Sequence, residues 1–184
     1  MIEIERLTRE ILAERLQEIC AVENMAAETS GGTYRHPWTR GDFTMDLPGK
    51  WTYSRLMRDN AKTIGFLVMS DKTSPAGMHY LHAHRAAVLK EVRRPNLLLD
   101  AYNDVFREAK VDGLTWFVTK QQSYHPAMLL WYIRVLGCAV LKERKCIEEF
   151  TGPLSGTVTV EADGKVVSGA AADREGQYFI AREL

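Results

Sequence analysis

The stretch that decides the fold runs from Met78 to Arg144 and reads MHYLHAHRAAVLKEVRRPNLLLDAYNDVFREAKVDGLTWFVTKQQSYHPAMLLWYIRVLGCAVLKER. Alternating apolar residues are typical of a strand, and apolar residues three or four apart are typical of a helix. Pro95 suits the first turn of a helix, where its missing N–H costs nothing, and Gly137 suits a helix C-terminus. The stretch predicts a strand at 79–89, a basic turn, a helix to about residue 110, a strand at 114–119, a helix at 126–136 and a strand from 139.

The flanking sequence adds elements on both sides of this stretch. Thr8 offers a side-chain oxygen as the N-cap of a helix, and the breakers within residues 28–50 predict loops. The other predicted elements are a strand at 2–6, a helix at 9–24, strands at 51–57 and 64–69, a hairpin that pairs 157–160 with 166–167, and a terminal strand at 178–180. These elements predict a mixed fold of helices and strands, α/β in the broad sense and α+β in the stricter classification. We expect one domain over 1–184, with a core at 1–145 and a C-terminal hairpin and last strand at 146–184.

Composition excludes several broad classes of function. The 184 residues include 24 basic and 24 acidic side chains, so no strong overall field attracts nucleic acid or an anionic membrane. No apolar run approaches the roughly 20 residues that span a bilayer, and the N-terminus does not read as a secretory signal. The three cysteines, Cys20, Cys138 and Cys146, form no C-x-x-C motif. We expect reduced thiols in a cytoplasmic protein.

The order of predicted elements resembles the GNAT superfamily of N-acyltransferases over roughly residues 2–145. The resemblance implies a mixed, mostly antiparallel sheet with two splayed central strands and helices on both faces. It implies that acetyl-CoA or another acyl-CoA enters between the strands at 79–89 and 114–119, and that an amine attacks the thioester directly. Backbone groups of Ala87 and Val88 would pair with the pantetheine arm. Arg93, Arg94 and Asn96 would hold the diphosphate.

The sequence departs from the family pattern at two places. Where the family has small residues in its pyrophosphate loop, this chain has Arg93 and Pro95, so the basic turn either clamps phosphate through side chains or is simply solvated. In the second helix, Tyr132 lies one residue from the place of the tyrosine that commonly protonates the leaving thiolate. One residue is about 100° around a helix. Tyr132 is therefore either a displaced catalytic acid or a packing residue.

The segment His82-Ala83-His84 is the most specific candidate for a catalytic site in the sequence. Side chains two apart on a strand share a face, so both imidazoles would lie on the face of Tyr80. Imidazole suits a base that takes a proton from an amine near neutral pH, and His82 or His84 could serve; the alternative is a polar strand face under a loop. A metal site would need a third ligand, His36 or Asp42, and we predict none.

Two short segments, Leu136–Val140 and Gly176–Ile180, also resemble small GNAT-like proteins of short-tailed bacteriophages. This second resemblance implies an alternative: a GNAT-like protein without turnover that acts in binding or assembly, with the C-terminal hairpin pairing to a second copy or another partner. A further alternative is an acyltransferase that takes its acyl group from a carrier protein. The acceptor in the enzymatic reading would be a small-molecule or peptide amine.

Overall fold

A computed structural model describes residues 1–30, 36–92, 96–168 and 176–184. Contacts divide the chain into two compact units. Unit 1 comprises Met1–Asp71 and Ala83–Asp112, and unit 2 comprises Lys72–His82 and Gly113–Leu184. Two long strands, β3 (Lys62–Thr73) and β4 (His79–Val88), each contribute residues to both units.

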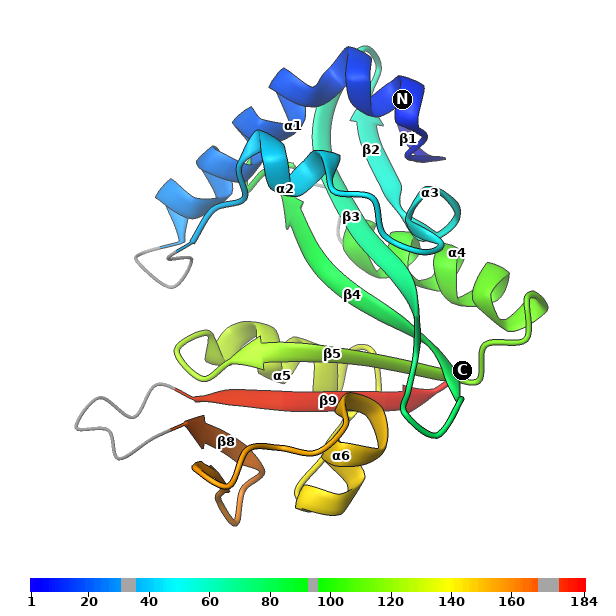
Figure 1. Ribbon diagram of the computed structural model, residues 1–184. Coiled ribbons are helices and arrows are strands. Elements are labelled where there is room, and N and C mark those ends of the chain that lie inside the picture. Colours follow the sequence, from blue (N-terminus) through cyan, green and yellow to red (C-terminus); the bar gives the residue numbers. More distant parts are fainter. Residues whose placement is uncertain (31–35, 93–95, 169–175) are drawn as a thin grey trace. The chain divides into compact units, whose positions relative to one another are not determined.

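The sheet of unit 1 has the order β1-β2-β3-β4, where β1 is Ile2–Arg6 and β2 is Arg55–Asp59 (Figure 1). Both β1–β2 and β2–β3 are antiparallel. The β2–β3 register shifts from Arg58↔Thr63 to Met57↔Gly65, so Ile64 is the extra residue of a β-bulge. The bulge changes which residues of β3 share a face, and it places Thr63 and Phe66 on the same side.

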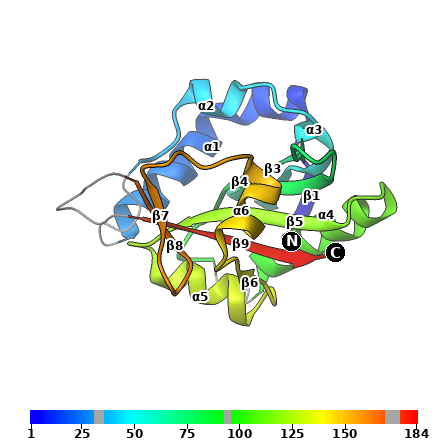
Figure 2. The same cartoon turned by 60° about the horizontal axis from the view of Figure 1, so that its bottom comes forward.

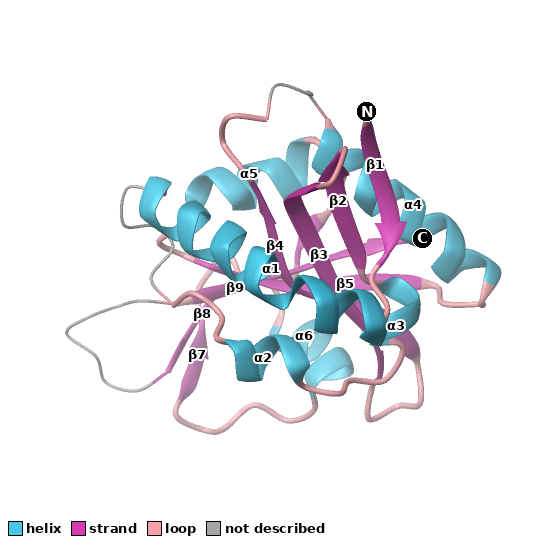
Figure 3. Cartoon of the chain, turned by 90° about the horizontal axis from the view of Figure 1, so that it is seen from above, coloured by secondary structure: helices cyan, strands magenta, loops and turns pink. Residues whose placement is uncertain are grey.

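Three helices follow β1 in unit 1: α1 (Arg9–Thr29), α2 (Arg40–Thr44) and α3 (Lys50–Tyr53). Thr8 caps α1 as predicted, because its hydroxyl accepts from the Ile11 N–H at 3.2 Å. The Glu18 carboxylate of α1 accepts from the Thr63 hydroxyl at 2.6 Å, and the Phe43 ring of α2 packs edge-on against Phe66. These contacts place α1 and α2 on one face of the sheet (Figure 3).

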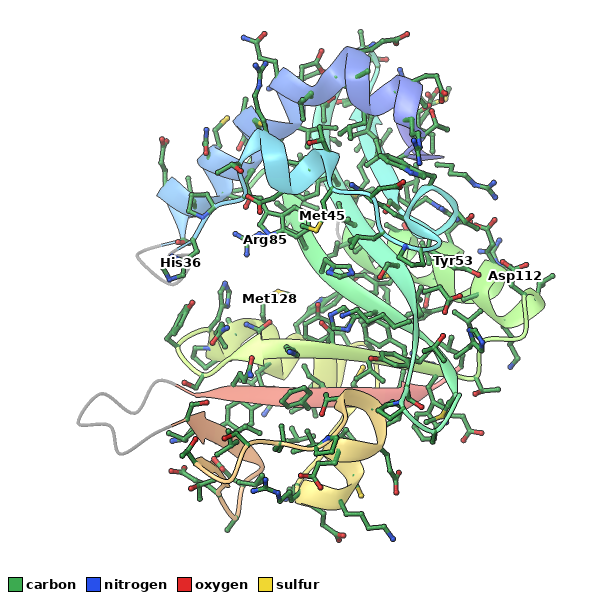
Figure 4. All side chains as sticks on the ribbon, viewed as in Figure 1. His36, Met45, Tyr53, Arg85, Asp112 and Met128 are labelled. Atoms are coloured by element: carbon green, nitrogen blue, oxygen red, sulfur yellow. The ribbon has the colours of Figure 1, made fainter. Side chains whose placement is uncertain are left out.

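The opposite face of this sheet is covered by α4 (Leu97–Val111). Arg55 of β2 has an exposed fraction of only 4%, and its guanidinium pairs with Asp104 and Glu108 of the helix, both at 2.6 Å. Just beyond α4, Asp112 accepts a hydrogen bond of 2.8 Å from the Tyr53 hydroxyl, and Figure 4 labels this pair. Polar contacts therefore hold α4 against β2 and α3.

Unit 2 contains the first residues of β4 followed by the order β5-β9-β8-β7. These strands are β5 (Trp116–Gln122), β7 (Val158–Val160), β8 (Lys165–Ser168) and β9 (Gln177–Glu183), and β6 (Ala139–Val140) also pairs with β9. Every residue of β5 is antiparallel to a residue of β9, from Trp116↔Glu183 to Gln122↔Gln177. The C-terminal strand thus lies inside this sheet, while the three-residue β7 forms its edge.

Two helices lie on opposite faces of the β5–β9 pair, α5 (Pro126–Arg134) and α6 (Arg144–Thr151) (Figure 2). Tyr132 of α5 stacks on Phe117 at 6.3 Å between ring centroids. Phe150 of α6 packs edge-on against Trp116 at 5.8 Å. Because Trp116 and Phe117 are consecutive in a strand, their side chains point to opposite faces.

Several sequence-based boundaries were wrong. The predicted strand at 51–57 is in fact helix α3 followed by β2, since Gly49 adopts a left-handed conformation that turns the chain and the buried ammonium of Lys50 donates to the carbonyls of Phe43 and Met45. The predicted loops at 28–50 contain the end of α1 and all of α2. Helix α6 was not predicted. No helix in the described ranges is both long and apolar enough to cross a membrane.

At Gly65, β3 approaches the backbone of β4 closely. A Cβ there would lie 2.9 Å from the Ala87 carbonyl oxygen and 3.2 Å from the Met57 methyl carbon. Because a backbone oxygen cannot move aside cheaply, we expect Gly65→Ala to lower the free energy of unfolding by about 2 kcal/mol. Urea denaturation measures this. The control is Gly41→Ala in the exposed helix α2, where the nearest atom lies at 3.6 Å and no loss is expected; equal losses at both positions would contradict the argument.

Candidate functional site

The beginning of strand β4 forms the first part of the candidate site. Tyr80 and His82 are two residues apart, so they share a face, and both are buried; the exposed fraction of His82 is 8%. Their rings meet edge-on at 6.4 Å, and the Tyr80 hydroxyl donates to the carbonyl of Phe150 at 3.2 Å. The contact with α6 fixes Tyr80 and leaves the His82 imidazole beside it.

Neighbouring strands continue this face. Val118 and Lys120 alternate along β5 with the Phe117 face that packs on α5, and the register pairs Lys120 with Phe179 of β9. The Lys120 ammonium lies 5.2 Å from the centre of the Phe179 ring, within range of a cation–π contact. The end of β3 adds Lys72 to the same region.

These elements enclose a pocket of about 370 Å³ that lies wholly within unit 2. We call it the β4–β5 pocket. Its lining combines two ammonium groups, one imidazole, four hydroxyls and aromatic rings. The residues are Lys72, Thr73, Ser74, Pro75, Tyr80, His82, Val118, Lys120, Phe150, Thr151 and Phe179. No carboxylate belongs to this described lining, so the pocket is electropositive.

The charges of the pocket affect one another. The pKa of Lys72 is lowered, first because burial disfavours its charged form and second because the Lys120 ammonium repels it. Within the described ranges, neither lysine forms an ion pair with a carboxylate. The two ammonium groups are therefore close enough to repel each other and lack a counter-ion of their own.

The second histidine of the predicted cluster, His84, has different surroundings. It lies in unit 1, where its Nε2 is 2.7 Å from the Ser70 hydroxyl oxygen and its ring is 6.4 Å from that of Trp38. Next to it, Arg85 pairs with the fully buried Glu23 at 2.7 Å. The Arg85 guanidinium also donates to the His36 carbonyl at 2.6 Å, and Figure 4 labels both residues. These polar contacts tie the later part of β4 to α1.

Tyr132 occupies the environment of a packing residue. It is buried, stacks on Phe117 and touches the ring of Trp131. Because Phe117 faces away from Val118 and Lys120, Tyr132 lies on the face of the sheet opposite the β4–β5 pocket. This position fits the 100° displacement that the helix spacing predicts.

The predicted acyl-CoA residues lie at the other end of β4 and beyond it. The Leu89 N–H donates to the Ile64 carbonyl of β3 at 2.9 Å, so the backbone groups of Ala87 point to β3 as well, and those of Val88 point to the opposite side. Asn96 is exposed in a left-handed conformation immediately before α4. Arg93 and Arg94 lie outside the described residues.

The structure also shows the surroundings of Cys138 and of Asp42, one of the two candidate third metal ligands. Burial raises the pKa of the Cys138 thiol to about 12, which makes it an inert core group and not a nucleophile. Asp42 accepts hydrogen bonds from the N–H and hydroxyl of Thr39 in a capping box of α2. Among the described residues, no three His, Cys, Asp or Glu side chains are placed to hold a metal ion.

Comparison with solved structures identifies the fold, although no protein-family model and no curated protein matches the sequence. The ribosomal-protein-S18-alanine N-acetyltransferase of Escherichia coli matches with a TM-score of 0.63 at 15% identity, over 100% of this chain and 94% of that one. Ard1 of Thermoplasma volcanium matches with a TM-score of 0.66 at 11% identity, over 100% and 97%. Arabidopsis thaliana Naa50 in complex with the bisubstrate analogue CoA-Ac-MVNAL matches with a TM-score of 0.64 at 9% identity, over 100% and 99%.

The chain therefore has the GNAT N-acyltransferase fold, as the order of elements predicted. The sequence analysis proposed His82 as a candidate but did not indicate the residues that surround it. Four of these lining residues come from separate segments of the chain, and their local sequences do not indicate that they meet. They are Lys72, Lys120, Phe150 and Phe179. The one usable signal was the alternation of Val118 and Lys120 on β5, which places a charge on a face that is otherwise apolar.

Proposed function

We propose that this protein transfers an acyl group from acyl-CoA to an amine, with His82 as the group that takes the amine proton. The observation that carries the proposal is the His82 imidazole, buried in the wall of an electropositive pocket in a chain with the GNAT fold. Acyl-CoA would supply a carbonyl activated as a thioester. A new C–N bond would form as the C–S bond breaks, and the thiolate would leave with a proton from solvent.

Each residue has a role in this proposal that its chemistry supports. The neutral imidazole of His82 accepts the amine proton as nitrogen attacks, which requires the amine to enter the β4–β5 pocket. His84 is the alternative base. The backbone of Val88 is directed away from β3, which makes its N–H and C=O available to an extended pantetheine arm, more so than those of Ala87.

The diphosphate would bind at the start of α4. The first N–H groups of a helix lack partners within the helix and attract anions, and α4 is 15 residues long. Asn96 immediately precedes these groups, and Arg93 and Arg94 would add charge. Asp100 lies in the first turn and opposes a nearby anion, which fits a weaker hold on the nucleotide than a glycine-rich loop gives.

The experiment is a thiol-release assay with acetyl-CoA and a panel of primary amines, combined with mass analysis of the amine. We expect release of free CoA that depends on the amine, and acetylation of the amine itself. Millimolar acetyl-CoA should also raise the melting temperature, because a ligand of the native state stabilises it. No thermal shift and no amine-dependent release would overturn the proposal. A carrier-protein-bound acyl donor that reacts where acetyl-CoA does not would favour the carrier-dependent alternative.

A further inference from the structure

The β4–β5 pocket offers hydrogen-bond donors and positive charge, and its described lining offers no acidic group in return. Lys72 and Lys120 supply two ammonium groups, and Thr73, Ser74 and Thr151 supply hydroxyls. Some of these hydroxyls are used within the protein: the Ser74 oxygen accepts from the Met78 N–H at 3.1 Å, and the Thr151 hydroxyl donates to Ile147 at 3.0 Å. Among the residues that the structure describes, neither ammonium group has a carboxylate partner.

Lys72 is half-buried and Lys120 is exposed, and both line one pocket, so an anion bound between them would be stabilised by both charges. Burial and the charge of Lys120 both lower the pKa of Lys72, and no described carboxylate raises it. Among the described residues, other buried cations are satisfied within the protein: Arg55 pairs with two carboxylates, Arg85 pairs with Glu23, and the Lys50 ammonium donates to two carbonyls. Lys72 and Lys120 have no carboxylate partner among the described residues, and a bound anion would remove the repulsion between them.

The remaining walls define the body of the ligand. Tyr80, Phe150 and Phe179 give the pocket apolar aromatic surface next to its charges. A volume of about 370 Å³ suits a small molecule. His82 belongs to the same lining, so a ligand that fills the pocket meets the imidazole, the two ammonium groups and the aromatic rings at once.

We propose that the β4–β5 pocket binds the acyl acceptor as a small amine that carries a carboxylate, with Lys72 and Lys120 binding the carboxylate and His82 meeting the amine. This inference rests on the proposed function and specifies its substrate class. The aromatic walls favour an acceptor with an apolar side chain. An amine without an anionic group would leave the two ammonium groups unbalanced and would bind weakly.

The test uses phenylalanine and phenylalaninamide, which share the amine and the ring and differ in the carboxylate. Calorimetric titration without acyl-CoA should show tighter binding of phenylalanine. Lys72→Met and Lys120→Met should each weaken its binding about tenfold, since hydrogen bonds to charged groups contribute on that scale. The control is Lys145→Met, an exposed lysine on α6 outside the lining, which should bind phenylalanine as the wild type does.

Folding of the variants is checked in the same samples. Lys72→Met removes a partly buried, repelled charge, so we expect its melting temperature to rise by about 2 °C, not to fall. In the acetyl-CoA assay, the lysine variants should raise KM for phenylalanine about tenfold with little change in kcat, because the carboxylate contact forms before the chemical step.

The outcomes separate this inference from the proposed function. Equal binding of phenylalanine and phenylalaninamide, or a preference that survives both lysine substitutions, would overturn the carboxylate site even in an active enzyme. Tighter binding of O-phosphoethanolamine, which has an amine and a phosphate but no carboxylate, than of phenylalanine, lost in the same variants, would overturn the choice of carboxylate in favour of phosphate. A lysine-dependent preference without acetyl transfer would overturn the acceptor role and the proposed function while supporting the anion site.

Discussion

Arg55→Met is expected to lower the free energy of unfolding by about 3 kcal/mol, because it removes one partner of a buried ionic cluster and leaves the others. Arg55 is almost fully buried, and its guanidinium binds Asp104, Glu108 and the carbonyls of Thr52 and Ser54 at 2.6 to 3.1 Å. Methionine fills a similar volume but satisfies none of these acceptors. Denaturation in guanidinium chloride, followed by tryptophan fluorescence, measures the loss.

The matched control is Arg107→Met in α4, the helix that carries Asp104 and Glu108. Arg107 is 75% exposed and reaches Asp104 only at 3.8 Å, so its removal should change stability by less than about 0.5 kcal/mol. A second arm adds Glu108→Gln to Arg55→Met. If the loss comes from uncompensated charge, the double variant should recover part of it. A loss no larger for Arg55→Met than for Arg107→Met would show that the cluster does not hold α4 to the sheet.

His82→Gln is expected to reduce kcat/KM for acetyl transfer by about 100-fold or more, the scale of a general base. Glutamine keeps a similar size and hydrogen-bonding capacity, so the pocket should stay intact, but it cannot take the amine proton. Initial rates of thiol release measure the effect, and a melting curve confirms that the variant is folded.

Two other histidines of β4 serve as controls for His82. His79 is exposed and alternates to the opposite face of the strand, so His79→Gln should retain full activity. His84→Gln removes the contact with Ser70 in unit 1 and should cost less than His82→Gln. If His84→Gln abolishes transfer while His82→Gln spares it, the base is His84 and the role given to the β4–β5 pocket fails.

The elements that local patterns predicted are the ones that local physics stabilises. Thr8 caps α1 through its own hydroxyl, and the alternation in His79–Val88 appears as β4. The segment Lys50–Tyr53 was misread because Trp51, Thr52 and Tyr53 favour strands. Its helix depends on the left-handed turn at Gly49 and on the carbonyls of Phe43 and Met45 that bind the Lys50 ammonium, and strand propensity alone records neither.

In the candidate site too, local sequence indicated some residues and only tertiary packing indicated the others. The sequence made His82 a candidate because a polar pair in an apolar strand is visible along the chain. The assignment of Lys72 and Lys120 to one pocket needed the pairing of β5 with β9 and the packing of α6. Phe179 illustrates the difference. The sequence predicted its strand, but not that the strand enters the sheet beside β5.

The sequence by itself determined the order and type of most elements, because periodicity, capping and turn residues act over a few neighbours. It also determined the resemblance to the GNAT fold, which depends on that order. Only the tertiary structure decided that two ammonium groups and an imidazole share one pocket with aromatic rings. The reason is physical: burial, repulsion and ion pairing depend on distances between segments that are far apart in the chain, and a local pattern does not record those distances.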